Sequence, residues 1–181
     1  RIAETQFELG AVLEDREEIE AAFAHYERAL ALDPAHARAA ARWGIALAAR
    51  GRFAEARPLL ERSLALDREQ GLAHASLAQI DAAQDRPREA AAHYRESLRL
   101  DPDYYIAANN LAQLLATTSD TELRDPAEAI RLAQAALRAA GEHPAVLDML
   151  ALAQAAAGQV AHAVETATRA SELAREQGDA A

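Results

Sequence analysis

The segment HYERALALDP, which begins at His25, comes back further along the chain as HYRESLRLDP, which begins at His93. A third and looser copy, LLERSLALDR, begins at Leu59, midway between them in register. The underlying period is therefore about 34 residues, and self-similarity at a fixed period of this length is typical of repeat proteins, in which each unit buries its apolar face only against its neighbours. We expect a linear core that grows by one repeat at a time.

Alignment of the Asp-Pro endings divides the chain into one array, 1–181, of five repeats and ten helices. The predicted repeats are about 3–36, 37–70, 71–104, 105–143 and 144–177, and the fourth carries five extra residues. The second repeat shows the spacing of an amphipathic helix. The residues on that face are Ala40, Trp43, Gly44 and Leu47. Gly51 is expected to end this helix.

The sequence also predicts where helices end and where two helices of a pair cross closely. Asp33-Pro34 and Asp101-Pro102 are expected to end helices, because proline cannot continue the hydrogen-bond ladder and disfavours helix in the residue before it. Gly44, Ala56 and Ser63 are small enough to let two antiparallel helices approach closely.

The amino-acid composition and net charge exclude several classes of partner and site. A formal net charge of −10 disfavours binding to a phosphate backbone, so no nucleic-acid partner is expected. No apolar run approaches the roughly 20 residues that span a bilayer, so no direct membrane insertion by this segment is expected. The absence of Cys excludes disulfides and thiolate sites but leaves the compartment open between cytoplasm and periplasm. The alanine-rich, arginine-only usage suggests a bacterial protein.

These repeats resemble the tetratricopeptide repeat (TPR) family, whose 34-residue pattern reads W-x2-L-G-x2-Y, with A, F, A and P further on. The residues that carry the resemblance in the first repeat are Leu9, Gly10, Leu13, Ala22, Tyr26, Ala29 and Pro34. Those in the third are Leu77, Ala78, Ala90, Tyr94, Ser97 and Pro102. The family's Trp at position four is missing from all five repeats, and the one Trp is Trp43, at position seven. The resemblance implies an all-α fold, a right-handed α-solenoid of stacked antiparallel helix pairs.

Catalysis is not expected. The six His residues occupy equivalent or distant repeat positions, and no HExxH occurs, so no metal site is predicted. No GxSxG, P-loop or GxGxxG motif is present, and no cofactor is predicted.

Binding of a protein or peptide segment is the function that the resemblance implies, because the first helices of TPR repeats line a concave groove. The residues predicted to contact a partner there are Arg38, Arg42, Ile45, Leu72, Gln79, Ile106, Asn109, Asn110 and Gln113. Arg38 and Arg42 could hold a carboxylate, and Asn109 and Asn110 could pair with an extended backbone. The alternative for these polar residues is that they are merely solvated. One TPR subset clamps a C-terminal carboxylate with Lys and Asn side chains, but this chain has no Lys and departs from that pattern.

Two features leave alternatives open. The stretch TTSDTELRDP, in a loop at about 117–126, is either a tolerated insertion or a contact loop. The first repeat is strongly acidic and the second basic, which indicates either surface ion pairs or an acidic end that docks a partner. We therefore predict a non-catalytic interaction scaffold that binds a partner in its groove. The alternative is an accessory domain or subunit of a larger bacterial enzyme or assembly, a membrane-bound one included, that docks through its edges and the loop at 117–126.

Overall fold

The computed structural model describes residues 1–178, and within that range every regular element is an α-helix. The ten helices of these residues are α1 (Ile2–Asp15), α2 (Ile19–Leu32), α3 (Ala37–Ala48), α4 (Phe53–Leu66), α5 (Gly71–Ala83), α6 (Pro87–Leu100), α7 (Tyr105–Thr117), α8 (Pro126–Ala140), α9 (Pro144–Ala156) and α10 (Val160–Gly178). The chain divides into two compact units, Arg1–Ile80 and Asp81–Ala181, and the boundary falls within α5.

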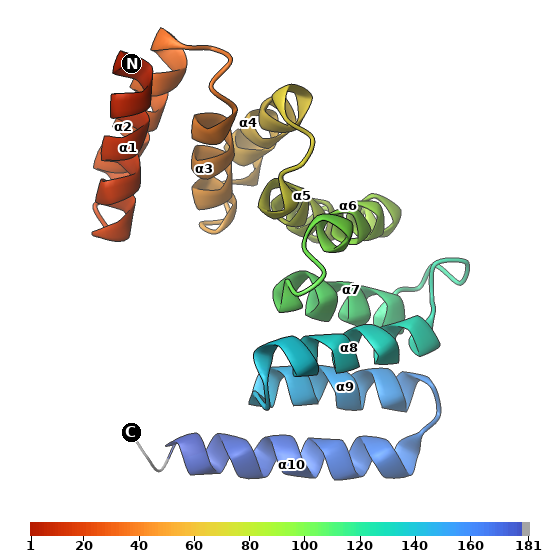
Figure 1. Cartoon of the computed structure of the whole chain (residues 1–181). Coiled ribbons are helices and arrows are strands. Elements are labelled where there is room, and N and C mark those ends of the chain that lie inside the picture. The colour runs from red at the N-terminus through yellow and green to blue at the C-terminus, as the bar shows by residue number, and fades with distance from the viewer. Residues whose placement is uncertain (179–181) are drawn as a thin grey trace. The chain divides into compact units, whose positions relative to one another are not determined.

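In the N-terminal unit, Arg1–Ile80, α1 packs against α2 and α3 packs against α4 (Figure 1). Helix α2 also contacts α3, so the two pairs share one apolar core. The largest fully buried side chains of that core are Tyr26, Leu47, Leu60, Leu77 and Ile80. The linear core that the repeat pattern predicts is therefore built from side chains of successive repeats.

In the C-terminal unit, α6 contacts α7, and α7 to α10 lie one against the next with alternating direction (Figure 1). Helix α7 also contacts α9, which belongs to the following pair. Fully buried side chains of this unit include Leu111, Leu115 and Val146. The described residues thus have the predicted fold class, an all-α solenoid of antiparallel helix pairs.

Two glycines allow the helices of a pair to cross closely. A Cβ atom on Gly44 would lie 2.7 Å from Cγ of Leu60 and 3.3 Å from the carbonyl oxygen of Ala56. A Cβ atom on Gly10 would lie 2.6 Å from the ring of Tyr26. A larger residue would have to push the helices apart, which is the role predicted for the small residue in the second repeat.

Helices α2, α4 and α6 each end one residue before an aspartate. Asp33, Asp67 and Asp101 all have extended backbone at the C-cap. The carboxylate of each accepts a hydrogen bond from the backbone N–H two residues later, at 3.0, 3.0 and 3.3 Å respectively. Such an Asx turn competes with continuation of the helix. Because Arg68 follows Asp67, where proline follows the other two, the aspartate rather than the proline is common to all three ends.

Candidate functional site

A surface cavity of about 320 Å³ opens on the N-terminal unit, where α1, α3 and the start of α5 meet. This cavity, called the N-terminal groove below, is lined by Phe7, Arg38, Ala41, Arg42, Ile45, Gln70, Gly71, Leu72 and Ala73. The structure brings together here four of the nine residues predicted to contact a partner, namely Arg38, Arg42, Ile45 and Leu72.

Arg38 lies in the first turn of α3 and is held on two sides. Its Nη1 donates a 3.1 Å hydrogen bond to Oε1 of Glu4, and its guanidinium carbon lies 4.6 Å from the ring centroid of Phe7. The other oxygen of Glu4, Oε2, lies 3.0 Å from Nε2 of His36. Because Nδ1 of His36 accepts from the backbone N–H of Ala39, the Nε2 atom is the one that donates to Glu4. The Arg38 side chain remains 68% exposed.

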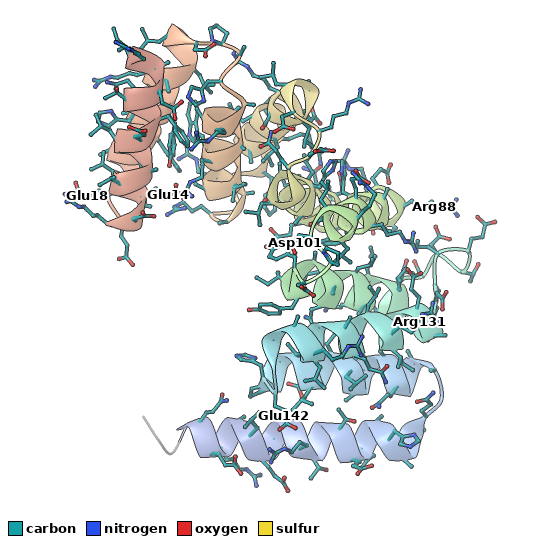
Figure 2. All side chains as sticks on the ribbon, in the orientation of Figure 1. Glu14, Glu18, Arg88, Asp101, Arg131 and Glu142 are labelled. Carbon is teal, nitrogen blue, oxygen red and sulfur yellow. The ribbon has the colours of Figure 1, made fainter. Side chains whose placement is uncertain are left out.

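Arg42 lies one helical turn further along α3 and is part of a network that reaches the core. Its Nε lies 3.3 Å from Oε2 of Glu14, and its Nη2 lies 3.7 Å from Oδ1 of Asp15. The same Glu14 oxygen accepts a 2.6 Å hydrogen bond from the hydroxyl of the buried Tyr26; Figure 2 labels Glu14 on α1. Burial and then this hydrogen bond raise the pKa of Tyr26 to about 12. A hydrogen bond with Tyr26 also raises the pKa of Arg42, so its charge is secure.

The apolar part of the N-terminal groove comes from α3 and α5. Ile45 is half-buried and packs against the core, whereas Leu72, in the first turn of α5, is 55% exposed. The turn before Leu72 is fixed by Gln70, whose Nε2 donates to the carbonyl of Ser63 and to that of Asp67. Leu72 is therefore an exposed apolar side chain at a helix start whose preceding turn is fixed by hydrogen bonds.

The remaining predicted contact residues lie outside this cavity. Gln79 is exposed on α5, and Ile106, Asn109, Asn110 and Gln113 lie on α7, in the C-terminal unit. Oδ1 of Asn109 is buried, and no hydrogen-bond partner for it exists among residues 1–178. Asn110 hydrogen-bonds the hydroxyl of Tyr94, whose pKa burial raises to about 12. Asn110 is therefore engaged within the protein by a hydrogen bond that the sequence did not reveal.

The loop between α7 and α8 is tied to α6. Nε of Arg88 donates to Oδ2 of Asp120, and its Nη2 donates to Oε2 of Glu122 over 2.6 Å. These bonds raise the pKa of Arg88 and lower that of Asp120. Figure 2 shows Arg88 directed toward this loop. The backbone N–H of Asp125 also donates to the carbonyl of Leu115, so the loop is held from two sides.

Some acidic side chains of the first repeat form ion pairs with arginines of the second repeat inside the N-terminal unit. Glu4 pairs with Arg38, which occupies the same position of the following repeat, and Glu20 lies 3.8 Å from Arg52. Opposite charges one period apart are a sequence signal that could have predicted the pair of Glu4 and Arg38. Arg88 and Glu122 show the same offset in the C-terminal unit.

Neither a metal site nor a membrane span is evident in residues 1–178. No three His, Cys, Asp or Glu side chains of this range gather as metal ligands would. None of the described helices combines the length and the apolar character needed to cross a bilayer.

Two family models described as tetratricopeptide repeat match the chain, one at residues 13–80 and the other at residues 75–123. No curated protein matches the sequence. Several solved structures share the fold. MamA from Desulfovibrio magneticus RS-1 is 18% identical, with a TM-score of 0.80 over 97% of this chain and 96% of that one.

YrrB, described as a TPR protein with an unusual peptide-binding site, is 21% identical, with a TM-score of 0.74 over 91% of this chain and 82% of its own. The O-GlcNAc transferase of Thermobaculum terrenum is 22% identical, with a TM-score of 0.66 over 76% of this chain but only 26% of that one. The two matching models together cover residues 13–123, and the described helices pair as such repeats do, so the chain belongs to the tetratricopeptide repeat family.

Proposed function

We propose that this protein is a non-catalytic interaction scaffold that binds an extended segment of a partner protein in the N-terminal groove. The observation that carries the proposal is the combination of exposed and fixed side chains at one cavity. Leu72 is 55% exposed and Arg38 is 68% exposed, yet each stands on a helix turn that is braced by hydrogen bonds. A site of this kind can receive a partner without reorganising itself.

The mechanism is preorganisation. Glu4 holds Arg38, and Glu14 holds Arg42, so the positions of both guanidinium groups are set before a partner arrives. Ordering a long side chain on binding costs about 0.5–1.5 kcal/mol, and here much of that ordering is already present. The similarity to YrrB, which is described as having a peptide-binding site, supports a peptide as the class of ligand.

The test compares two leucine variants with the same exposure. Leu72→Ser removes the apolar contact of the N-terminal groove, whereas Leu32→Ser removes a leucine that is also 55% exposed but lies at the end of α2, outside the cavity. Both should stay folded by circular dichroism. Partners captured from an extract of the native source should be lost with Leu72→Ser and kept with Leu32→Ser. Equal capture by both variants would contradict the proposal.

The second candidate is an accessory domain or subunit of a larger enzyme or assembly. It is favoured by the loop at 118–125, which is tied to α6 by the bonds of Arg88 to Asp120 and Glu122. The transferase of Thermobaculum terrenum, of which this chain spans 26%, supports the view that such an array can serve within a longer chain.

The loop variant Arg88→Gln decides between the two candidates. If docking uses the loop, capture should fall with Arg88→Gln and persist with Leu72→Ser. Arg131→Gln is the matched control, because it makes the same charge change on α8, away from these contacts (Figure 2).

A further inference from the structure

We infer that the N-terminal groove takes an internal acidic-aliphatic segment of a partner protein, in which a carboxylate lies next to an aliphatic side chain. This inference rests on the proposed function and adds the chemistry of the occupant. The nine residues that line the cavity include two cations, Arg38 and Arg42, and no carboxylate. The wall therefore offers hydrogen-bond donors and positive charge, and it calls for acceptors and negative charge.

The carboxylates of α1 near the cavity are already paired with its two arginines, and Asp15 lies 3.7 Å from Nη2 of Arg42. Glu4 accepts from Arg38 and His36, and Glu14 accepts from Tyr26 and pairs with Arg42. The bond to Glu4 uses only Nη1 of Arg38. A guanidinium carries five N–H donors, so those on Nε and Nη2 of Arg38 remain for a ligand.

The N-terminal end of α5 adds a partial positive charge to that of the two arginines. Gly71, Leu72 and Ala73 are its first three residues, and all three line the cavity. The N-terminal end of a helix carries a partial positive charge, because its first backbone N–H groups have no acceptor inside the helix. The dipole does not make the site by itself, but it acts in the same direction as Arg38 and Arg42.

The cavity also has an apolar surface, so its occupant needs an aliphatic side chain. This surface is formed by Ile45 and Leu72, together with the buried ring of Phe7 on α1. A volume of about 320 Å³ lies at the lower end of the roughly 300–1,000 Å³ typical of ligand sites. It suits one or two side chains of an extended segment rather than a folded element. Glutamate or aspartate beside leucine, isoleucine or valine meets both requirements.

The test uses labelled octapeptides, acetylated and amidated so that no chain terminus is charged. The probe is Gly-Ser-Glu-Leu-Glu-Leu-Ser-Gly, and its counterparts replace both Glu by Gln, both Glu by Arg, or both Leu by Ala. By fluorescence anisotropy, the Glu peptide should bind at least about tenfold more tightly than the Gln peptide, which is about 1.4 kcal/mol. The Arg and Ala peptides should bind more weakly still.

Variants of the protein test whether the preference for the Glu peptide depends on Arg38. Arg38→Gln should reduce the Glu-over-Gln preference at least about threefold, whereas Arg28→Gln, which makes the same charge change at an exposed site on α2, should leave it unchanged. Arg38→Glu should reverse the preference, so that the Arg peptide binds more tightly than the Glu peptide. A gain of this kind cannot come from misfolding.

Several results would overturn the inference. Equal affinity for the Glu and Gln peptides, or a preference of the unmodified protein for the Arg peptide, would do so. Binding only of a Glu peptide with a free C-terminal carboxylate would replace an internal segment by a chain end. If no octapeptide binds while partner capture still depends on Leu72, the occupant is wrong but the proposed function stands. If Leu72→Ser changes nothing, the proposed function itself fails.

Discussion

The hydroxyl of Tyr26 donates a 2.6 Å hydrogen bond to Oε2 of Glu14, and the same oxygen lies 3.3 Å from Nε of Arg42. One carboxylate thus joins a fully buried phenol in the core to an arginine at the rim of the N-terminal groove. This three-residue arrangement explains why Arg42 is held in place, and it links the stability of the first helix pair to the geometry of the groove.

Removal of the Tyr26 hydroxyl should destabilise the protein. Tyr26→Phe keeps the packing of the ring but leaves Glu14 without its hydroxyl donor, and a hydrogen bond to a charged group is worth about 1.5–3 kcal/mol. We expect the free energy of unfolding in urea to fall by about that amount. Tyr105→Phe, at a side chain 41% exposed, is the control and should change it by less than about 0.5 kcal/mol. Equal effects of the two variants would show that the bond to Glu14 contributes nothing.

Alkaline pH should weaken the fold through two tyrosines. The pKa values of Tyr26 and Tyr94 are raised to about 12 from an ordinary value of 10, because burial disfavours the phenolate. Their contribution to stability is therefore complete below about pH 10, the unfolded value, and is lost as the pH rises through about 12. Urea unfolding at a series of pH values measures this. Tyr26→Phe and Tyr94→Phe should each flatten the decline, and an unchanged slope would contradict the assignment.

Gly44 should not tolerate a side chain. The new Cβ of Gly44→Ala would lie 2.7 Å from Cγ of Leu60, and the strain of an overpacked core is about 1–3 kcal/mol, which outweighs the helix propensity of about 1 kcal/mol that alanine adds. We expect a net loss of stability on thermal or urea unfolding. Gly178→Ala, with nothing within 4 Å, serves as the control and should be neutral. A stabilised Gly44→Ala variant would mean that α3 and α4 can separate without cost.

Glycine should be the more stable residue in the turns of both of the first two helix pairs. Glu17 and Gly51 occupy equivalent positions of consecutive repeats, with φ of 64° and 73°. A non-glycine residue pays about 1–2 kcal/mol in this left-handed region, partly offset by the flexibility that glycine adds to the unfolded chain. On these grounds Glu17→Gly should raise the free energy of unfolding by about 0.5 kcal/mol, and Gly51→Ala should lower it by about 1 kcal/mol. Shifts of the same sign in both variants would refute the backbone explanation.

Four of the nine residues predicted to contact a partner line the cavity, but the interactions of their side chains could not be predicted from the sequence. The repeat positions selected Arg38, Arg42, Ile45 and Leu72, and the structure groups these four around one cavity. The same positions selected Asn110, whose side chain is instead bonded to the hydroxyl of the buried Tyr94. Repeat position indicates which helix face a residue occupies, whereas the hydrogen-bond partner depends on what the neighbouring helix places within about 3 Å.

The helix ends also show what could not be predicted from the sequence. The prolines after Asp33 and Asp101 predicted two endings correctly, but α4 ends at Leu66 without one. The Asx turn at Asp67 provides that ending, since its carboxylate satisfies the backbone N–H of Glu69. The aspartate was visible in all three copies, and its role becomes evident only from the geometry of the turn.

The repeat period, the helix pairs and the membership of the TPR family could be predicted from the amino-acid sequence alone, because a periodic apolar face specifies which residues must be buried. The folded structure was needed to show that Glu4 and Glu14 neutralise part of the second repeat's positive charge while Arg38 keeps free donors at the cavity. Burial follows a local pattern along one helix, whereas ion pairing and groove geometry depend on the side chains that separate repeats bring together.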